Sequence, residues 1–411
     1  MLTPSLADLF SPVPPLTERC SRFFFRINGT GLLHRRAVPA VAMAAVLVGA
    51  GVVAAAVDVG ETDPAMTVLR RLVLQWHLTD ACDNCCRHCY GEAKEPVAVS
   101  WEQMCEVVAQ YRHLLDNLAR HRGHRPLPQL TLSGGDPLCH DLLFPLLELL
   151  RQSPSPLPFA LLCNARRLDA GTVLRLAKAA PRFVQLSLDG NRQGHDSLRG
   201  EGDYDRVVAA VRRLHRKGIT VLLAFTARRS NYRQFPEVAA LGRKLGVRRV
   251  WADRFIPLGG SAKERDEVLT PQETQEFVTL LAKSRRRRGF RRSPVAMQRA
   301  LQFLAGDARP YRCQAGRELL TLLPDGTLVP CRRLPLPLGN VFATSMTTLY
   351  HEAPLLRELR SHKRGTGCEG CFYAELCGGG LRCLSQAVSG EWRQRDPGCC
   401  GRAEGVTPLR G

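Results

Sequence analysis

Lysine and aromatic residues are scarce in this chain of 411 residues. Only seven of the 58 basic residues are lysine, and aromatic residues make up 6% of the sequence. The net charge of +20 is therefore carried by arginine, in blocks such as Arg285–Arg288. The sequence has no stretch in which basic residues alternate with aromatic ones, and it has no recognised RNA-binding motif. We therefore expect no nucleic-acid partner, and we interpret the arginine blocks as solvated helix ends or as a surface for an acidic peptide.

Cysteine is absent from residues 164–312, although the chain has 16 cysteines. One group lies at 82–89 and another at 368–400. At about 4% of the residues, cysteine is too dilute for a small disulfide-stapled scaffold. Such clustering favours metal ligation over a disulfide framework. Because hydrophobic residues make up 45% of the chain, wholesale disorder is excluded as well.

Residues 38–57, VPAVAMAAVLVGAGVVAAAV, carry no charge and are long enough to span a bilayer. Five arginines precede this run and three acidic residues follow it, so the positive-inside rule would place the rest of the chain outside the cytoplasm. The run is nevertheless weakly hydrophobic, with a single Leu, and Met66 stands just ahead of the first expected strand. We interpret residues 1–65 as an extension or a mis-assigned start, with a membrane anchor and a signal peptide as alternatives.

Short apolar runs alternate with amphipathic stretches over residues 66–300, which predicts β/α units around a parallel sheet. Six such units predict a partial, TIM-like (β/α)6 barrel rather than a closed one with eight units. Ser100 and Gln103 are typical of a capping box at the first helix. Further helices are expected over 203–217 and 231–245, and from Thr270. The expected strands are 72–79, 129–133, 159–162, 183–188, 219–226 and 249–256.

The pattern changes over residues 301–411, which are rich in Cys, Gly and Pro. Short strands are expected at 319–323 and 327–329, around the turn Pro324-Asp325-Gly326. We therefore expect an α/β barrel followed by a small, cysteine-rich domain that a cofactor holds together.

The first cysteine group follows the first expected strand, in the sequence WHLTDACDNCCRHCYG. Cys82, Cys86 and Cys89 have the spacing Cys-x3-Cys-x2-Cys, and Cys85 is an extra thiol. Three thiolates can bind three irons of a 4Fe–4S cube and leave the fourth iron open. With a fourth ligand elsewhere, they would instead bind zinc, so spacing alone leaves both sites open. His88 is either a hydrogen-bond partner of the cluster or a solvent-facing filler.

The order of the motifs resembles the radical S-adenosylmethionine superfamily over roughly residues 70–290. In that family an aromatic residue follows the last cysteine, and a Gly-Gly-Glu-Pro motif follows the second strand. Here Gly134-Gly135-Asp136-Pro137 departs from that motif by its Asp. The resemblance implies that the three cysteines bind a 4Fe–4S cluster and that S-adenosylmethionine binds the open iron. It implies cofactor contacts for Tyr90, Gly134, Gly135, Asp136, Asn164, Ser187, Asp189, Arg199 and Arg254.

The second cysteine group resembles the SPASM extension of radical S-adenosylmethionine maturases, which carries two auxiliary iron–sulfur clusters. The resemblance implies one complete ligand set, made of Cys368, Cys371, Cys377 and Cys399. The other set is incomplete. Cys313 and Cys331 match it, but Leu381 stands where the family has a further cysteine, and we expect Cys383 to substitute for that cysteine. The second site is left open between an incompletely ligated cluster, a smaller cluster and no cluster. A zinc ribbon is the alternative for 368–377.

The resemblance implies that a 5′-deoxyadenosyl radical is generated and that it modifies a ribosomally made peptide, through a thioether, a C–C cross-link or epimerisation. The alternatives are tetrapyrrole or quinone cofactor biosynthesis, sulfatase formylglycine maturation and, outside enzymes, a zinc or iron–sulfur binding protein. We expect a reducing electron donor such as flavodoxin or ferredoxin. Since cluster thiolates require a reducing setting, we also expect a cytoplasmic location, with membrane anchoring as the disfavoured alternative.

Overall fold

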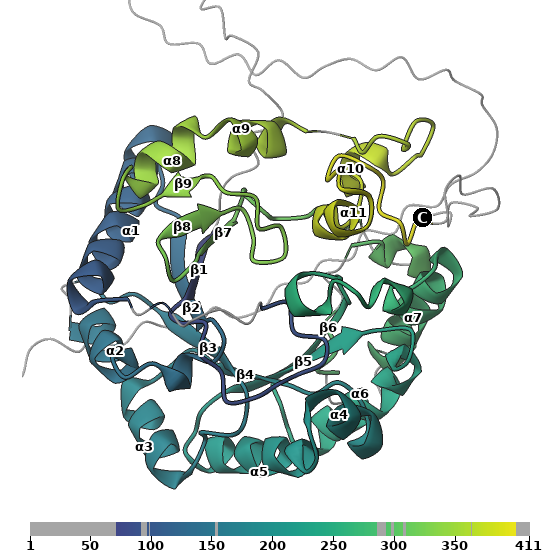
Figure 1. Cartoon of the computed structure of the whole chain (residues 1–411), viewed down its shortest axis with the longest axis horizontal. Coiled ribbons are helices and arrows are strands. Elements are labelled where there is room, and N and C mark those ends of the chain that lie inside the picture. The colour runs from purple at the N-terminus through teal and green to yellow at the C-terminus, as the bar shows by residue number, and fades with distance from the viewer. Residues whose placement is uncertain are drawn as a thin grey trace, which may run out of the picture. The chain divides into compact units, whose positions relative to one another are not determined.

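The computed structural model describes residues 71–91, 97, 99–152, 155–285, 293–296, 300–306, 310–362 and 364–399. The apolar run at 38–57, the whole expected extension 1–65 and the arginines that follow Arg285 in its block lie outside the described residues. Within the described part, a curved sheet carries helices along its outer side (Figure 1). The expected α/β class with an open barrel is confirmed.

Six parallel strands form the first part of the sheet, and they pair in the order in which they occur in the chain. All six expected strands are present, with ends shifted by a few residues. Their near-continuous apolar sequences suit strands that are covered on both faces. The strands are β1 (Arg71–His77), β2 (Leu127–Ser133), β3 (Phe159–Cys163), β4 (Val184–Ser187), β5 (Val221–Ala227) and β6 (Arg249–Arg254).

Helices follow the strands and cover the outer side of the sheet, as Figure 1 shows for α1, α2, α3, α5 and α7. The helices of the barrel are α1 (Trp101–Arg122), α2 (Leu143–Gln152), α3 (Ala170–Ala179), α4 (Arg192–Arg199), α5 (Asp203–Arg216), α6 (Phe235–Lys244) and α7 (Pro271–Arg285). The capping box expected before α1 is formed: the Ser100 hydroxyl accepts from the Gln103 N–H at 3.2 Å, and the Ser100 N–H donates to Gln103 Oε1 at 2.9 Å.

The hairpin expected around Asp325 is confirmed, and it extends the barrel sheet. Its strands are β7 (Leu319–Leu322) and β8 (Thr327–Val329), followed by the short β9 (Gly339–Asn340). β7 pairs in parallel with β1, so the sheet has nine strands in the order β6-β5-β4-β3-β2-β1-β7-β8-β9. β6 and β9 are the two edges of this open sheet.

Alternation along the strands separates an apolar outer face from a polar inner face. Leu72, Leu74 and Trp76 of β1 pack in the hydrophobic core, while Gln75 and His77 point to the opposite side. At β1 the inner face of the sheet is therefore polar although it is buried.

The chain after the sheet forms four short helices, α8 (Met346–Glu352), α9 (Pro354–Ser361), α10 (Ala374–Cys377) and α11 (Arg382–Ser389). α8 lies beside α1, where His351 Nε2 is 2.8 Å from Asn117 Oδ1 (Figure 1). None of the helices described in the structure combines the length and the apolar character that a membrane span requires.

Candidate iron–sulfur sites

The first cysteine loop leaves the carboxyl end of β1 and is held there by the residues that follow β2. The Gly135 N–H donates to Thr79 O at 2.7 Å, and the Asp136 N–H donates to Ala81 O at 2.8 Å. A Cβ on Gly134 would lie 2.2 Å from Thr79 O, and one on Gly135 would lie 2.3 Å from Ala81 O. Both glycines are therefore required by the close approach of this backbone to the cysteine loop.

The far end of the same loop is held by the residues that follow β6. A Cβ on Gly259 would lie 2.0 Å from Tyr90 O, and the Gly260 N–H donates to Gly91 O at 3.2 Å. In the middle of the loop, the Arg87 N–H donates to Leu198 O in α4 at 2.9 Å. The loop is thus fixed at both ends and at its centre by backbone contacts.

Each of the three predicted ligand thiols has a nitrogen donor near its sulfur. Arg199 Nη1 is 3.4 Å from Cys86 Sγ, and Asn164 Nδ2 is 3.7 Å from Cys82 Sγ. The Gly91 N–H is 3.3 Å from Cys89 Sγ. Hydrogen bonds of this kind stabilise thiolate ligands and adjust the potential of an iron–sulfur cluster.

Burial raises the pKa of the Cys82 thiol to about 11, and burial also raises the pKa of Cys86, where Arg199 opposes the rise. Metal binding would therefore displace a proton from each thiol. In the described part of the chain, no three His, Cys, Asp or Glu side chains converge on one point as ligands of a single ion would. A cube does not require such convergence, because each thiolate binds a different iron.

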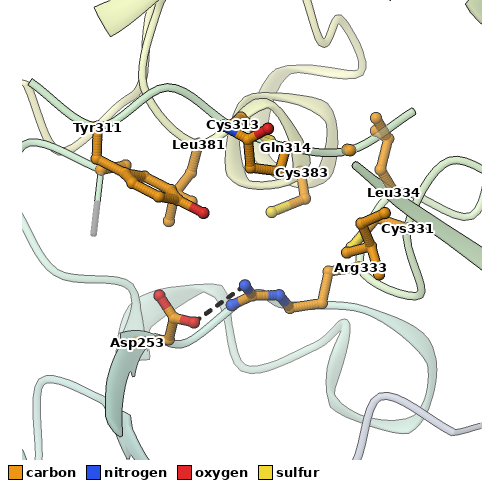
Figure 2. A pocket seen from close by; sticks show the side chains of 12 residues that line it. Asp253, Tyr311, Cys313, Gln314, Cys331, Arg333, Leu334, Leu381 and Cys383 are labelled. Carbon is orange, nitrogen blue, oxygen red and sulfur yellow. Dashed lines mark hydrogen bonds and ion pairs between the residues drawn. The ribbon is translucent and has the colours of Figure 1, made fainter. Parts of the chain in front are cut away.

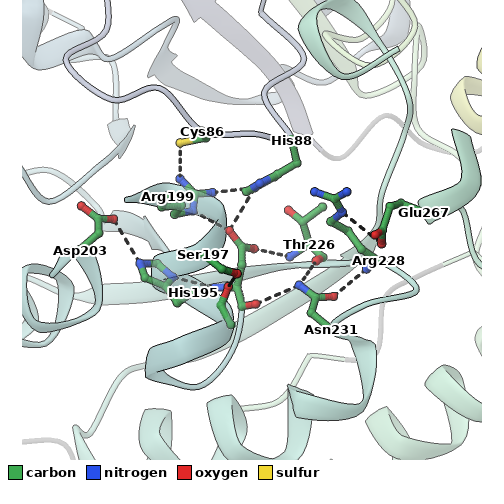
Figure 3. Close-up of polar contacts among 12 residues, drawn as sticks. Cys86, His88, His195, Ser197, Arg199, Asp203, Thr226, Arg228, Asn231 and Glu267 are labelled. Atoms are coloured by element: carbon green, nitrogen blue, oxygen red, sulfur yellow. Dashed lines mark hydrogen bonds and ion pairs between the residues drawn. The ribbon is translucent and has the colours of Figure 1, made fainter. Parts of the chain in front are cut away.

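Asp189, just after β4, is the centre of a buried polar network beside Cys86. Figure 3 labels its partners Arg199, His88 and Thr226. Its Oδ2 accepts from Arg199 Nε at 2.6 Å and lies 3.1 Å from His88 Nε2. Its Oδ1 accepts from the Thr226 N–H at 2.8 Å. Burial alone would raise the pKa of Asp189, but the Arg199 guanidinium and the bond with His88 hold it well below its ordinary value. His88 is therefore a buried partner of this network rather than a solvent-facing filler.

His195 fixes the backbone of Asp189 from the other side. The Asp189 N–H donates to His195 Nδ1 at 3.0 Å, which requires that Nδ1 carry no hydrogen. His195 Nε2 lies 3.1 Å from Asp203 Oδ2 and therefore donates to that carboxylate. The chain Asp203–His195–Asp189–Arg199 thus aligns the Arg199 guanidinium with the cysteine loop.

Asp136 is fully buried, and both of its carboxylate oxygens are engaged by backbone. Oδ1 accepts from the Leu138 N–H at 2.8 Å, and Oδ2 accepts from the Asn164 N–H at 2.6 Å. Burial raises the pKa of this carboxyl to about 7, although the two hydrogen bonds oppose the rise. The structure therefore gives Asp136 a positioning role for Asn164, and a direct contact with the cofactor stays a prediction.

Tyr90, Ser187 and Arg254 have different surroundings. Arg332 Nη1 donates to the Tyr90 hydroxyl at 3.1 Å. Ser187 ends β4, half-buried and in register with Ala224. Arg254 makes a two-pronged ion pair with Asp396, 2.8 Å from Nη1 to Oδ1. Its guanidinium therefore joins β6 to the C-terminal cysteine segment, and its expected place at the cofactor stays a prediction.

The incomplete auxiliary set lines one cavity of about 80 Å³. Cys313, Cys331 and Cys383 all border it, although Cys383 is far from the other two in the sequence (Figure 2). Arg333 also lines the cavity, with Nη2 3.0 Å from Asp253 Oδ2 on β6. Burial lowers the pKa of Arg333, but Asp253 and the three thiols outweigh it and hold that pKa well above its ordinary value. Sequence reasoning missed Arg333 and Asp253, since neither belongs to a spacing motif.

The complete auxiliary set lies around the short helix α10. Cys368 and Cys377 are buried, while Cys371 and Cys399 are half-buried. Burial raises the pKa of Cys377 to about 12, and the charges of Cys399 and Cys368 contribute to the rise. Cys377 is thus close enough to Cys399 and to Cys368 for repulsion between thiolates, which a bound metal centre would relieve.

Comparisons with known proteins give two family matches. The radical SAM superfamily matches residues 76–242, and the SPASM iron–sulfur cluster-binding domain matches residues 313–372. Pre-heme d1 synthase of Dinoroseobacter shibae is 28% identical, over 80% of this chain and 85% of that protein. The mycofactocin maturase MftC of Mycolicibacterium smegmatis is 26% identical, over 75% of this chain and 77% of that protein.

Among solved structures, Streptococcus suis SuiB bound to S-adenosylmethionine has the same fold, with a TM-score of 0.63 at 17% identity over 81% of this chain and 78% of that chain. SuiB bound to its precursor peptide SuiA matches with a TM-score of 0.61 at 16% identity over 80% of this chain and 75% of that chain.

Proposed function

Since this chain is a radical S-adenosylmethionine enzyme with a C-terminal SPASM domain, we propose that it modifies a ribosomally made peptide. The modification would be a thioether, a C–C cross-link or an epimerisation. A maturase among its relatives and a structural neighbour solved with a precursor peptide support this choice. The enzyme uses 4Fe–4S clusters and S-adenosylmethionine, which together supply a 5′-deoxyadenosyl radical that abstracts hydrogen from an unactivated C–H bond.

We assign Cys82, Cys86 and Cys89 as ligands of the cluster that leaves one iron for S-adenosylmethionine. Cys368, Cys371, Cys377 and Cys399 are the ligands of one auxiliary cluster, and Cys313, Cys331 and Cys383 those of the other. Three donors around the first set fit anionic sulfur, and the cavity shared by the last three gives that set a common space. We also propose that Arg199, which Asp189 aligns, binds the carboxylate of S-adenosylmethionine.

The main observation in support of this proposal is a contact between the loop of Cys82–Cys89 and the segment that follows Cys331. Tyr90 directly follows Cys89, Arg332 directly follows Cys331, and the Arg332 guanidinium donates to the Tyr90 hydroxyl at 3.1 Å. A substrate held at this contact would reach the radical on one side and an auxiliary cluster on the other. A cluster held by Cys313, Cys331 and Cys383 would supply an electron acceptor there, which formation of a thioether or a C–C cross-link requires and an epimerisation does not. Positioning both centres at one place is the contribution of the protein chain.

Tetrapyrrole modification is the second candidate, because pre-heme d1 synthase is similar to the chain over most of its length. In either case we propose a reducing cytoplasm as the location and flavodoxin or ferredoxin as the electron donor. The thiolate ligands that this proposal requires stay reduced in such a compartment.

Anaerobic reconstitution with iron, sulfide, dithionite and S-adenosylmethionine tests the ligand assignment. The wild-type chain should form 5′-deoxyadenosine, and Cys86→Ala should form none. Cys105→Ala is the matched control, because Cys105 is a half-buried thiol on α1 outside the three sets. Equal product from Cys86→Ala and wild type would refute the assignment.

The substrate is tested by adding, in turn, short peptides encoded beside the gene and Fe-coproporphyrin III. Mass spectrometry of the products should show a peptide changed in mass, or after hydrolysis in stereochemistry, together with 5′-deoxyadenosine. A changed porphyrin beside unchanged peptides would replace the peptide proposal with tetrapyrrole modification.

A further inference from the structure

A row of polar residues crosses the inner face of the sheet at its centre. Gln75 of β1 is in register with Thr131 of β2 on one side and with Thr321 of β7 on the other. His77 lies two residues further along β1, on the same face, in register with Ser133. All five side chains are buried. The inner face is therefore built for a polar occupant.

Two nitrogens on this face lack a protein partner. Gln75 Nε2 and His77 Nε2 are both buried, and within the described residues neither has a hydrogen-bond partner. Gln75 is 6% exposed and His77 is 5% exposed, so bulk solvent has little access to form hydrogen bonds with them. Buried polar groups in native proteins are nearly always paired, so these two indicate a group that is absent from the chain itself. Gln75 Nε2 can only donate, so the missing partner must accept hydrogen bonds.

Arg332 adds a positive charge at the same place. Its backbone N–H donates to Thr321 Oγ1 at 3.0 Å. Its guanidinium carbon lies 5.1 Å from the centre of the Tyr90 ring, which in turn is 6.2 Å from the His77 ring. No carboxylate pairs with this guanidinium among the residues that the structure describes, whereas the adjacent Arg333 pairs with Asp253. Burial and the Arg332 charge lower the pKa of His77 to about 3, so His77 is neutral and offers one N–H.

Arg332, Gln75 and His77 together offer hydrogen-bond donors and one positive charge. A guanidinium, a side-chain amide and a neutral imidazole N–H are together complementary to a carboxylate. We propose that Arg332, His77 and Gln75 bind a carboxylate of the substrate between the radical and auxiliary cysteine sites. This proposal rests on the proposed function and adds a requirement to it: the substrate carries an acid near the carbon that reacts. The acid is a Glu or Asp side chain or a C-terminus in a peptide, and a propionate in a tetrapyrrole.

The test compares matched acid and amide probes on the reconstituted holoenzyme. Fe-coproporphyrin III and its tetraamide are titrated by absorbance, and Ac-Ala-Glu-Ala-NH2 and Ac-Ala-Gln-Ala-NH2 by saturation-transfer NMR. At least one acid should bind roughly tenfold more tightly than its amide, as loss of a charged hydrogen bond predicts. The pair that shows the difference identifies the source of the carboxylate. Equal binding of acid and amide in both pairs would overturn the proposal and leave water as the partner of these nitrogens.

Variants assign the site. Arg332→Gln should abolish the preference for the acid, and Arg332→Lys should keep part of it because the charge remains. Arg233→Gln is the matched control, since this exposed arginine pairs with Glu276 outside the sheet and should leave the preference unchanged. If Arg332→Gln loses iron, His77→Ala takes its place and should weaken acid binding. An acid preference as large as that of wild type in folded Arg332→Gln, or acid binding as tight as that of wild type in folded His77→Ala, would refute the site.

The failure of the proposed function would look different. The same wild-type samples are assayed for 5′-deoxyadenosine and for iron. Wild-type protein that forms no 5′-deoxyadenosine but prefers an acid would contradict the proposed chemistry and support the site. Wild-type protein that forms 5′-deoxyadenosine but binds acids and amides equally would support the proposed chemistry and contradict the carboxylate site.

Discussion

Removing one partner of the ion pair between Arg254 and Asp396 should strongly destabilise the chain. Arg254 is 5% exposed and Asp396 is fully buried. Asp396 Oδ1 also accepts from the Gly398 N–H at 2.9 Å, and Oδ2 accepts from the Leu381 N–H at 2.8 Å. The Asp396 carboxylate therefore organises the segment that leads to Cys399 and attaches it to the end of β6.

Asp396→Asn preserves the size of the side chain and removes its charge, which leaves the Arg254 guanidinium buried without a counter-ion. Breaking a buried pair in this way costs about 3–5 kcal/mol. Unfolding entropy of about 2.1 cal/mol/K per residue gives about 0.7 kcal/mol/K for Thr62–Gly411, a unit of roughly 350 residues. The melting temperature of the variant should therefore fall by roughly 4–7 °C.

Anaerobic differential scanning calorimetry of the reconstituted protein measures this shift. Glu276→Gln is the control, because it breaks the exposed pair with Arg233, which is worth about 0–1 kcal/mol. Its melting temperature should change by less than about 1.5 °C. Arg254→Met combined with Asp396→Asn should recover part of the loss, since the uncompensated charge is gone. A melting temperature of Asp396→Asn within the range of the control would refute the reasoning.

Three further predictions concern the cysteine sites. Gly135→Ala should lose about four irons per chain in an anaerobic iron assay, because the added Cβ would lie 2.3 Å from Ala81 O. Gly171→Ala is the control and should retain its iron, because no atom would lie closer than 3.6 Å to its added Cβ. Cys383→Ser should lose iron and an EPR signal of the auxiliary clusters while Cys105→Ser keeps both, and full iron in Cys383→Ser would remove Cys383 from the ligands. Burial raises the pKa of Asp136 from 3.8 to about 7, so the folded chain keeps the carboxyl proton at pH values where the unfolded chain has released it. The stability that this bound proton contributes is lost as the pH rises through about 7. Melting temperatures from about pH 5.5 to 7.5 should fall in wild type and fall less in Asp136→Asn, and parallel slopes would contradict this.

The strands β1 to β8, the starts of α1, α5 and α7, and the family could be predicted from the sequence, because they depend on local patterns. Apolar runs mark β1 to β6, and the Ser100–Gln103 pair marks the start of α1. The pairing of β7 with β1 could not be predicted in this way. β7 has four residues, and no local pattern tells which strand edge it joins.

Site residues could be predicted where the ligands recur at a fixed spacing in the sequence. They could not be predicted where residues that contact each other come from distant segments of the chain. Cys383 was expected to substitute in the incomplete set, and the structure places it in one cavity with Cys313 and Cys331. Asp253 and Arg333 of the same cavity carry no spacing signal, because β6 and the segment after β8 supply them separately. Gly134 and Gly135 were expected for a ligand, whereas their close contacts in the structure are with the backbone of the cysteine loop.

The pairing of β7 with β1 explains how two cysteine regions so distant in sequence come into contact. Cys82, Cys86 and Cys89 follow β1, while Cys331 and Arg332 follow the hairpin that β7 begins. Because β1 and β7 are hydrogen-bonded neighbours in parallel register from Val73–Leu319 to Trp76–Leu322, the two regions are fixed relative to each other by the sheet itself. Sheets in a packed core do not deform continuously. The distance between the proposed radical and auxiliary sites is therefore set by strand pairing, and side chains such as Arg332 and Tyr90 change only what lies between the two sites.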